Sequence, residues 1–426
     1  MNTGQIEEAL QKGTYDERLQ DIYVDESLIS YERNRYAEAL RKFRSFFGEG
    51  ETELFSAPGR TEICGNHTDH QHGEVLAASI NKDAIAVVRK TAEPIVKIVS
   101  EGYGKEIAID IRDTEKRPEE EGTTEALLRG ILAKTKENGW QAGGFQAYIT
   151  SDVLIGAGLS SSAALETLIG TVLSHLYNDG RITAVEIAML GQYAENRYFG
   201  KPCGLMDQMA CSVGSLVHID FADPENPQTE SLFMDLHAHG CSLCITDTKG
   251  SHADLTPDYA AIPAEMKRAA ACFGQEVLGA LTPADVLEKL PLIRKEAGDR
   301  AALRALHYAC ENERVREAVK ALKEEHFAEF LCLVRESGDS SYKYLQNVYT
   351  CHDTEHQNVS VALAVSEMLL WKNGACRVHG GGFAGTIQAF VPEDMVEKYR
   401  TEMDRIFGKN SCSVLQIRKY GGIKVL

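Results

Sequence analysis

The chain of 426 residues is long enough for about two domains, and its 43% hydrophobic and 25% charged content is typical of a soluble globular protein. A formal net charge of −18 opposes bulk attraction to nucleic acid or to an anionic membrane and favours small-molecule partners. No apolar run reaches the roughly 18 residues of a membrane span, and the N-terminus is too polar for a signal peptide, so we expect a cytoplasmic protein. The 11 cysteines are an odd number scattered through apolar segments, which favours reduced thiols over a disulfide framework.

The predicted elements of the first half alternate between helices and strands. Their order is polar helices within residues 1–48, a strand over 53–57 that ends at Pro58-Gly59, strands within 75–110, a helix over about 122–138, a strand over 144–151, a helix that ends near Asn178-Asp179-Gly180 and a helix over 184–199. The last helix begins at a capping box, Thr183-x-x-Glu186, and its Glu195 lies on the inward face.

After residue 235 the chain changes to long amphipathic helices. These are predicted over 263–279, 284–290, 296–336 and 354–373, and strands follow near 383–392 and 412–419. His237, His239, Cys241 and Cys244 have the spacing of metal ligands. However, CSLCITDT predicts a strand, in which residues three apart face opposite sides, so we expect no shared ion. The pattern therefore predicts a mixed α and β chain with a boundary near 235.

A glycine-rich turn that leads into a helix, DVLIGAGLSSSAALE at 152–166, is the strongest chemical signal. Backbone N–H groups of Gly156, Gly158 and Ser160 to Ser162 could converge on an anion there, because glycine permits close approach and the helix N-terminus carries positive dipole charge. The turn is not a Walker loop, because no Gly-Lys-Ser/Thr follows the glycines. A turn capped by its own serines, without a ligand, is the structural alternative.

Two further clusters are polar or glycine-rich. The segment APGRTEICGNHTDHQHG at 57–73 contains Arg60, His67 and Asp69, which are suited to holding sugar hydroxyls beside a phosphate, although a solvated loop is the alternative. The segment HGGGFAG at 379–385 permits close backbone approach or simply forms a flexible turn.

Together these clusters resemble the three motifs of the GHMP kinase superfamily and, within it, of the galactokinase family. APGR and GNHTDH resemble APGR…GEHTDY, IGAGLSSSA resembles PIGxGLSSSA, and GGGFAG resembles GGGFGG. PCGLMDQ at 202–208 and HYACENERV at 307–315 resemble the family's PCGxMDQ and HxxxENERV, so the resemblance spans roughly residues 30–420. It implies a two-lobed α+β fold with ATP between the lobes. The implied parts are an extension over 1–30, a ribosomal-S5-like α/β lobe over 31–235 and a helix-rich α/β lobe over 236–426.

The resemblance implies an ATP-dependent sugar 1-kinase. Asp207 would take the proton from the anomeric hydroxyl, and Arg60 would keep Asp207 ionised beside the phosphate. Ser162 and Glu195 match the family's Mg²⁺ ligands. The residues that it implies for ATP binding are Gly156, Gly158, Leu159, Ser160, Ser161, Ser162, Gly381 and Gly382. Helix capping by Asp207 and pairing of Glu195 with an arginine are the structural alternatives.

Sugar recognition departs from the family pattern. Asp69, His67 and Tyr259 match residues that hold the sugar, but Asn66 replaces the glutamate that accepts a hydrogen bond from the 6-hydroxyl. Galactose or a galactose-like hexose is the expected substrate. Galacturonate or another galacto-configured sugar is the alternative. Asn66 in place of the glutamate removes the repulsion of a C6 carboxylate, which is worth roughly 1 to 4 kcal/mol at about 4 Å. Further departures are Glu62, His70, His72 and His379.

A catalytically silent sensor of sugar and ATP is another alternative, which the retention of Arg60, Ser162, Glu195 and Asp207 opposes. A kinase for a non-sugar alcohol agrees poorly with His67-Thr68-Asp69. The expected partners are a small-molecule sugar and ATP, without nucleic acid or membrane. The sequence leaves the oligomeric state open, and a monomer is compatible with it.

Overall fold

The computed structural model describes residues 1–102, 105–153, 158–250, 255–383 and 385–426. Its first lobe contains an eight-stranded sheet. The strands are β1 (Glu53–Cys64), β2 (Glu74–Lys90), β3 (Ile95–Ser100), β4 (Ile107–Asp110), β5 (Phe145–Ser151), β6 (Leu216–Asp220), β7 (Gln228–Leu232) and β12 (Ile423–Lys424). The helices are α1 (Thr3–Gln11), α2 (Asp16–Tyr23), α3 (Ile29–Phe47), α4 (Thr124–Glu137), α5 (Ser161–Asn178), α6 (Ala184–Ala194) and α7 (Met206–Val213).

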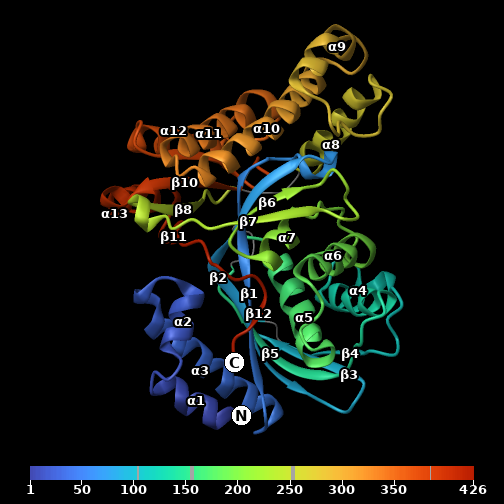
Figure 1. Ribbon diagram of the computed structural model, residues 1–426, viewed down its shortest axis with the longest axis vertical. Coiled ribbons are helices and arrows are strands. Elements are labelled where there is room, and N and C mark those ends of the chain that lie inside the picture. The colour runs from blue at the N-terminus through green and yellow to red at the C-terminus, as the bar shows by residue number, and fades with distance from the viewer. Residues whose placement is uncertain (103–104, 154–157, 251–254, 384) are drawn as a thin grey trace.

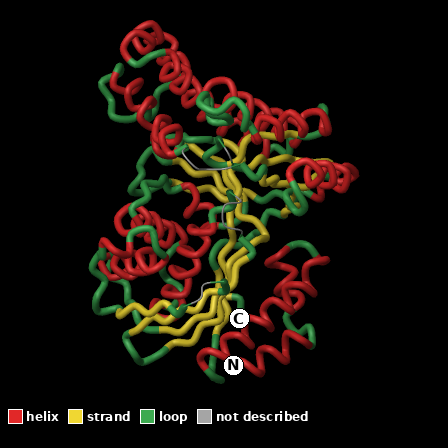
Figure 2. The backbone as a smooth tube through the Cα atoms, turned by 180° about the vertical axis from the view of Figure 1, so that it is seen from behind, coloured by secondary structure: helices red, strands yellow, loops and turns green. Residues whose placement is uncertain are grey.

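The large sheet lies between two helical layers. Figure 1 shows α1–α3 on one side of it and α4–α7 on the other, and Figure 2 shows the same layers from behind. The strand order is β12-β1-β2-β5-β3-β4, with β6 paired to β2 and β7 to β6. The paired strands are antiparallel except β3 and β5, which are parallel.

The second lobe contains a four-stranded antiparallel sheet in the order β11-β8-β10-β9. Its strands are β8 (Cys241–Asp247), β9 (Ala375–His379), β10 (Thr386–Pro392) and β11 (Cys412–Leu415), and its helices are α8 (Thr256–Ala271), α9 (Pro283–Glu296), α10 (Asp299–Lys323), α11 (Phe327–Ser340), α12 (Asn358–Leu370) and α13 (Val396–Phe407). One face of this sheet packs against α10, α11 and the first lobe, and the other packs against α12 and α13. Both lobes therefore share one hydrophobic cluster.

The strand that we predicted to end at Pro58-Gly59 does not end there. β1 continues to Cys64, and Pro58 lies opposite Asp83 of β2 at a register shift between Pro58 and Arg60. A bulge accommodates a proline in a strand because the ladder is already interrupted there. The prediction failed because pairing with β2 overrides the local breaker signal, and the continuation carries Arg60 to the junction between the lobes.

The first thirty residues are part of the first lobe. Apolar side chains of α1 and α2 are buried together with α3 against the sheet, among them Ile6, Leu19 and Tyr23. Arg35 of α3 and Arg418 both bind the buried carboxylate of Asp83, at 2.6 and 2.9 Å. Arg418 precedes β12, so the end of the described chain returns from the second lobe to complete the first.

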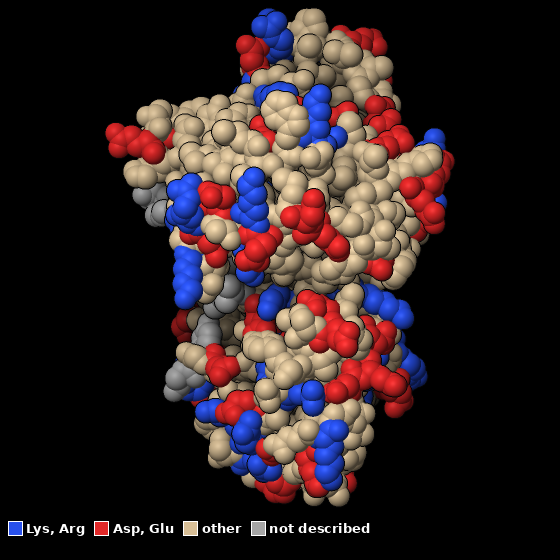
Figure 3. Space-filling model, turned by 90° about the vertical axis from the view of Figure 1, so that its left-hand side faces the viewer, with Lys and Arg blue, Asp and Glu red and all other residues tan. Residues whose placement is uncertain are grey.

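Two predicted helices are shorter than the periodicity indicates. The predicted helix over 296–336 is divided into α10 and α11 at residues 324–326, where Glu325 has a φ of 59°. The predicted helix over 184–199 is regular only to Ala194 and continues as a π-helical turn from Glu195 to Phe199. Within the described residues, none of the helices combines the length and apolar character that crossing a bilayer requires. Figure 3 shows acidic and basic side chains interspersed over both lobes on the face that it presents.

Candidate active site

Arg60 and Asp207 form the centre of the candidate site. Arg60 Nε and Nη2 donate to the two carboxylate oxygens of Asp207, each at 2.7 Å, and the Arg60 side chain is only 7% exposed. Burial raises the pKa of Asp207, but the charge and hydrogen bonds of Arg60, together with Ser160, outweigh burial and hold this pKa below its ordinary value. Asp207 is therefore ionised at neutral pH. Its carboxylate binds Arg60 rather than capping α7, in whose first turn it lies.

The glycine-serine turn lies directly on this pair. Arg60 Nη1 donates to Gly158 O, and Leu159 O accepts the backbone N–H of Arg60 at 3.1 Å. The Ser160 hydroxyl donates to Asp207 Oδ2 at 2.7 Å, and its oxygen accepts no backbone N–H of α5. The first backbone N–H groups of α5 are therefore left to other acceptors. In the structural alternative, a turn capped by its own serines, the Ser160 oxygen would have accepted one of them. Gly156 lies outside the described residues.

The second lobe packs against the turn. A Cβ atom on Gly158, whose φ is +70°, would lie 2.4 Å from Thr386 Oγ1 and 3.2 Å from His379 Nδ1. The His379 ring is buried between Thr61 of β1 and Thr386 of β10, and it binds both hydroxyls at 3.0 Å. Burial lowers the pKa of His379 well below its ordinary value, so the ring is neutral and adds no positive charge.

A pair of carboxylates lies beside the start of α5. Gln208 Nε2 donates to Glu166 Oε2 at 3.1 Å and to Glu195 Oε2 at 3.4 Å. Burial and the neighbouring Glu195 charge raise the pKa of Glu166, whose Oε1 is buried without a hydrogen-bond partner in the described part of the chain. The cation near Glu195 is Lys201, at 3.8 Å, rather than an arginine. Ser162 lies one turn before Glu166 on α5, and such hard oxygen atoms are suited to a divalent cation.

The loop from Gly65 to Glu74, which we call the sugar loop, carries the three predicted sugar residues of the first motif. Asn66 Nδ2 donates to Gly380 O at 2.8 Å, while Asn66 Oδ1 accepts from Asn347 Nδ2 at 2.7 Å and Ser341 Oγ at 3.3 Å. The Asn66 side chain thus joins the first motif to the third, and both lone pairs of its oxygen are used within the protein. The prediction that it contacts the sugar remains a prediction.

His67 and Asp69 also contact other motifs. His67 Nε2 donates to Gly381 O at 3.2 Å, and burial lowers the pKa of His67 to about 4. A Cβ atom on Gly204 would lie 1.7 Å from Asp69 Oδ2, so this carboxylate rests against the PCGLMDQ segment because residue 204 has no side chain. Burial raises the pKa of Asp69.

Tyr259 packs against the third motif, the glycine-rich segment at 379–385. Its hydroxyl donates to Gly382 O at 2.8 Å, and a Cβ atom on Gly381 would lie 2.8 Å from its ring. Gly382 has a φ of +90°, and a Cβ atom there would lie 2.0 Å from Asn347 O. The structure thus brings the described parts of the three motifs, the MDQ segment and Tyr259 into one cluster. Ala384 of the third motif lies outside the described residues.

Sequence reasoning noted Glu62 and His70 as departures from the family pattern but missed their partners and their burial. The Glu62 carboxylate is fully buried and binds Arg377 at 3.0 Å; burial raises its pKa to about 7 against the opposing effect of Arg377 and Arg60. Gln71 Nε2 donates to His70 Nδ1 at 3.2 Å, so His70 Nε2 carries the proton. That N–H is buried without a partner among the described residues. The substitutions at 62 and 70 were visible in the sequence, but Arg377, the partner of Glu62, lies 315 positions away, and the adjacent Gln71 gave no signal of its own.

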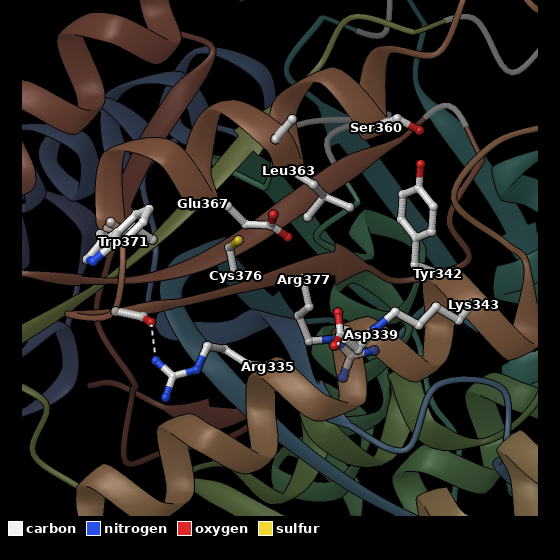
Figure 4. A pocket seen from close by; sticks show the side chains of 14 residues that line it. Arg335, Asp339, Tyr342, Lys343, Ser360, Leu363, Glu367, Trp371, Cys376 and Arg377 are labelled. Carbon is white, nitrogen blue, oxygen red and sulfur yellow. Dashed lines mark hydrogen bonds and ion pairs between the residues drawn. The ribbon is translucent and has the colours of Figure 1, made fainter.

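A surface hollow on the second lobe lies apart from the cluster. It has a volume of about 480 Å³ between α11, α12 and β9. Figure 4 shows Arg335 and Asp339 on α11 and Glu367 and Trp371 at α12 around it. The described residues that line it include no predicted site residue, and Arg377 alone connects it to Glu62.

The arrangement agrees with the comparisons with known proteins. The galactokinase galactose-binding signature matches residues 41–90, and the N-terminal domain of GHMP kinases matches residues 126–215. A galactokinase of Actinobacillus pleuropneumoniae serotype 3 (strain JL03) is 31% identical over 368 residues, which are 85% of this chain and 91% of that protein. A galactokinase of Clostridium tetani (strain Massachusetts / E88) is 27% identical over 90% of this chain and 95% of that protein.

Solved structures agree. The galactokinase of Lactococcus lactis, crystallised with galactose, has a TM-score of 0.77 and 26% identity over 90% of this chain and 98% of that one. A mevalonate kinase at 15% identity, with a TM-score of 0.59 over 86% of this chain and 99% of that one, shares the fold. The two-lobed α+β GHMP kinase fold is confirmed, and the chain belongs to the galactokinase family of GHMP kinases.

Proposed function

We propose that this protein is a galactose 1-kinase, which transfers the γ-phosphate of ATP to the anomeric hydroxyl of galactose. The observation that carries the proposal is the ionised Asp207 carboxylate, held by the Arg60 fork and by Ser160 at the N-terminus of α5. Membership of the galactokinase family supports it. This chain retains both Arg60 and Asp207, which disfavours a catalytically silent sensor.

Asp207 would accept the proton of the anomeric hydroxyl as that oxygen attacks the phosphate. Because Arg60 and Ser160 already hold the carboxylate, it needs little reorganisation at the moment of reaction. Arg60 would also face charge that develops on the attacking oxygen and the phosphate. The backbone N–H groups at Ser161 and Ser162 would bind phosphate oxygens, with Gly158 to Ser160 covering them and Gly381 and Gly382 closing the other side.

Ser162 and Glu195 would hold Mg²⁺, with Glu166 as a neighbouring carboxylate. The buried and unpartnered Glu166 Oε1, in the described part of the chain, supports a cation here, because two adjacent carboxylates repel each other without one. Bound Mg²⁺ would neutralise phosphate charge during transfer. Gln208 would orient both carboxylates through its amide.

Residues 31–235 and 236–426 would form the two halves of the site, with residues 1–30 supporting the first. Asp69 and His67 would bind sugar hydroxyls, and Tyr259 would close the pocket. Galacturonate is not favoured by the geometry, because a C6 carboxylate would need a donor from Asn66, and Asn66 Nδ2 already donates to Gly380 O at 2.8 Å and contacts the Glu62 carboxyl.

The test is Mg²⁺-ATP turnover, followed as ADP release, with galactose, galacturonate, N-acetylgalactosamine and glucose in parallel. We expect galactose to give the highest kcat/KM. Preference for galacturonate would identify Asn66 as a specificity switch and refute the substrate assignment. Sugar and nucleotide binding without ADP release would refute the kinase proposal and favour a sensor.

A further inference from the structure

One face of α10 contacts both ends of the sugar loop. The face belongs to the HYACENERV segment, and its side chains at 307, 308, 311 and 312 have the i, i+1, i+4 and i+5 spacing of a single helical face. The loop belongs to the first lobe and α10 to the second. The proposed chemistry gives this segment no role.

His307 and Glu311 hold the beginning of the loop. His307 Nε2 lies 2.9 Å from Asn66 O, and its Nδ1 lies 2.8 Å from Ser340 Oγ. Because a carbonyl only accepts, Nε2 carries the proton and Nδ1 accepts from the serine. Glu311 Oε1 accepts the backbone N–H of Gly65 at 2.9 Å. Arg314, His307, Arg377 and the Ser337 hydroxyl together outweigh burial and lower the pKa of Glu311 to about 2, so this is a hydrogen bond to an ionised acceptor.

Asn312 and Tyr308 hold the end of the loop. Asn312 Oδ1 accepts the backbone N–H of Glu74 at 2.9 Å, and the Tyr308 hydroxyl lies 2.9 Å from Gln71 O. A Cβ atom on Gly73 would lie 2.6 Å from Asn312 Oδ1 and 2.8 Å from Tyr308 Cε2. The loop therefore approaches α10 as closely as a glycine backbone permits.

The loop itself needs external support. His67 and His72 both have a φ of 60°, a left-handed conformation that a residue with a side chain keeps only where its surroundings impose it. Internal bonds such as Thr68 Oγ1 to Glu74 O close the loop on itself, at 2.7 Å. They fix its shape, but they do not fix its position relative to Tyr259 and Gly381 of the second lobe.

We infer that this face of α10 positions the sugar loop, so that His307, Glu311 and Asn312 are positioning residues for His67 and Asp69. The inference rests on the proposed sugar-kinase function. These four side chains attach the sugar loop to the second lobe, although β1 and β2, the strands that flank the loop, belong to the first lobe. Sugar affinity therefore depends on α10, whereas ATP contacts at the start of α5 do not.

The test compares Asn312→Ala with Val315→Ala in the full chain. Val315 lies on the same helix and is fully buried in the hydrophobic cluster, so its truncation also destabilises the protein but leaves the loop bonds intact. A second pair compares His307→Leu with His307→Gln, whose amide is able to donate to Asn66 O. The measurements are KM for galactose, KM for ATP, the thermal midpoint and hydrogen exchange of the peptide spanning residues 65–75.

We expect Asn312→Ala and His307→Leu to accelerate exchange in residues 65–75 and to raise the KM for galactose by about ten- to a hundredfold, with the KM for ATP unchanged. His307→Gln should recover part of the loss, and Val315→Ala should lower only the thermal midpoint. Unchanged exchange, or accelerated exchange with an unchanged sugar KM, would overturn the inference. An inactive wild-type enzyme would instead refute the proposed function, and the exchange rates alone would then decide whether α10 holds the loop.

Discussion

Replacing Glu62 by Gln is expected to change how stability depends on pH. The Glu62 carboxyl is buried among Arg377, Arg60 and Asp69, and burial raises its pKa from the ordinary 4.5 to about 7. A raised pKa in the folded state means that folding favours the protonated carboxyl. Its contribution to stability is therefore complete below pH 4.5 and is lost as the pH rises through 7.

The size of the effect follows from the two pKa values. Each unit of difference corresponds to about 1.4 kcal/mol, so the full contribution is about 3 kcal/mol, of which about 2.5 kcal/mol is lost between pH 5 and pH 8. Glu62→Gln has nothing to titrate at this position. The amide is uncharged at every pH, as the protonated carboxyl is, so position 62 contributes no pH dependence to the stability of the variant across this range.

Urea unfolding of both proteins at pH 5, 6, 7 and 8 measures the difference. We expect wild type to lose about 2.5 kcal/mol relative to Glu62→Gln over this range. Glu311→Gln is the matched control, because Glu311 is equally buried beside an arginine but its pKa is lowered to about 2. Its difference from wild type should stay constant from pH 5 to pH 8. A constant difference for Glu62→Gln as well would refute the argument that burial dominates at this carboxyl.

Three further outcomes are expected from the same cluster. Asp207→Asn should lower kcat by about 10² to 10⁴ while galactose binding, measured by calorimetry, persists; a near-normal kcat would mean that Asp207 only orients the sugar. Arg60→Met should raise the pKa of Asp207, because only Ser160 and Lys201 then oppose burial, and should move the acid limb of kcat/KM to higher pH; an unmoved limb would contradict this. Gly382→Ala should lower both the thermal midpoint and turnover, because its Cβ atom would lie 2.0 Å from Asn347 O; an unaffected variant would refute the close packing of that loop.

Local patterns predicted the parts of the site but not their partners. The helix after the glycine turn and the arginine of APGR are visible in a few consecutive residues. Whether Ser160 caps its own helix or binds Asp207 depends on a contact 47 positions away, which spacing does not encode. Glu62 and Arg377 are 315 positions apart. The sequence therefore showed Glu62 as an unusual residue but did not show that Arg377 balances its charge.

Predictions of the fold failed where tertiary contacts outweigh local signals. Pro58-Gly59 is a breaker in isolation, yet β1 passes through it because β2 supplies the pairing on both sides of the bulge. The apolar period from α10 into α11 continues across residues 324–326, since both helices bury residues in the same cluster, so periodicity did not reveal the break. Asn66 matched a sugar-binding position by alignment to a motif, but only the structure shows that its oxygen is occupied by Asn347 and Ser341.

The return of β12 to the first lobe has a consequence for the order of folding. Residues 53–64 leave the ribosome long before residues 418–424, so during synthesis β1 has an unpaired edge at Phe55 and Ser56. Over the same period the buried Asp83 carboxylate lacks Arg418. While the second lobe is being synthesised, the first lobe therefore has an unpaired β1 edge and an Asp83 carboxylate without one of its two arginine partners. It reaches its final stability only after residues 418–424 have been made.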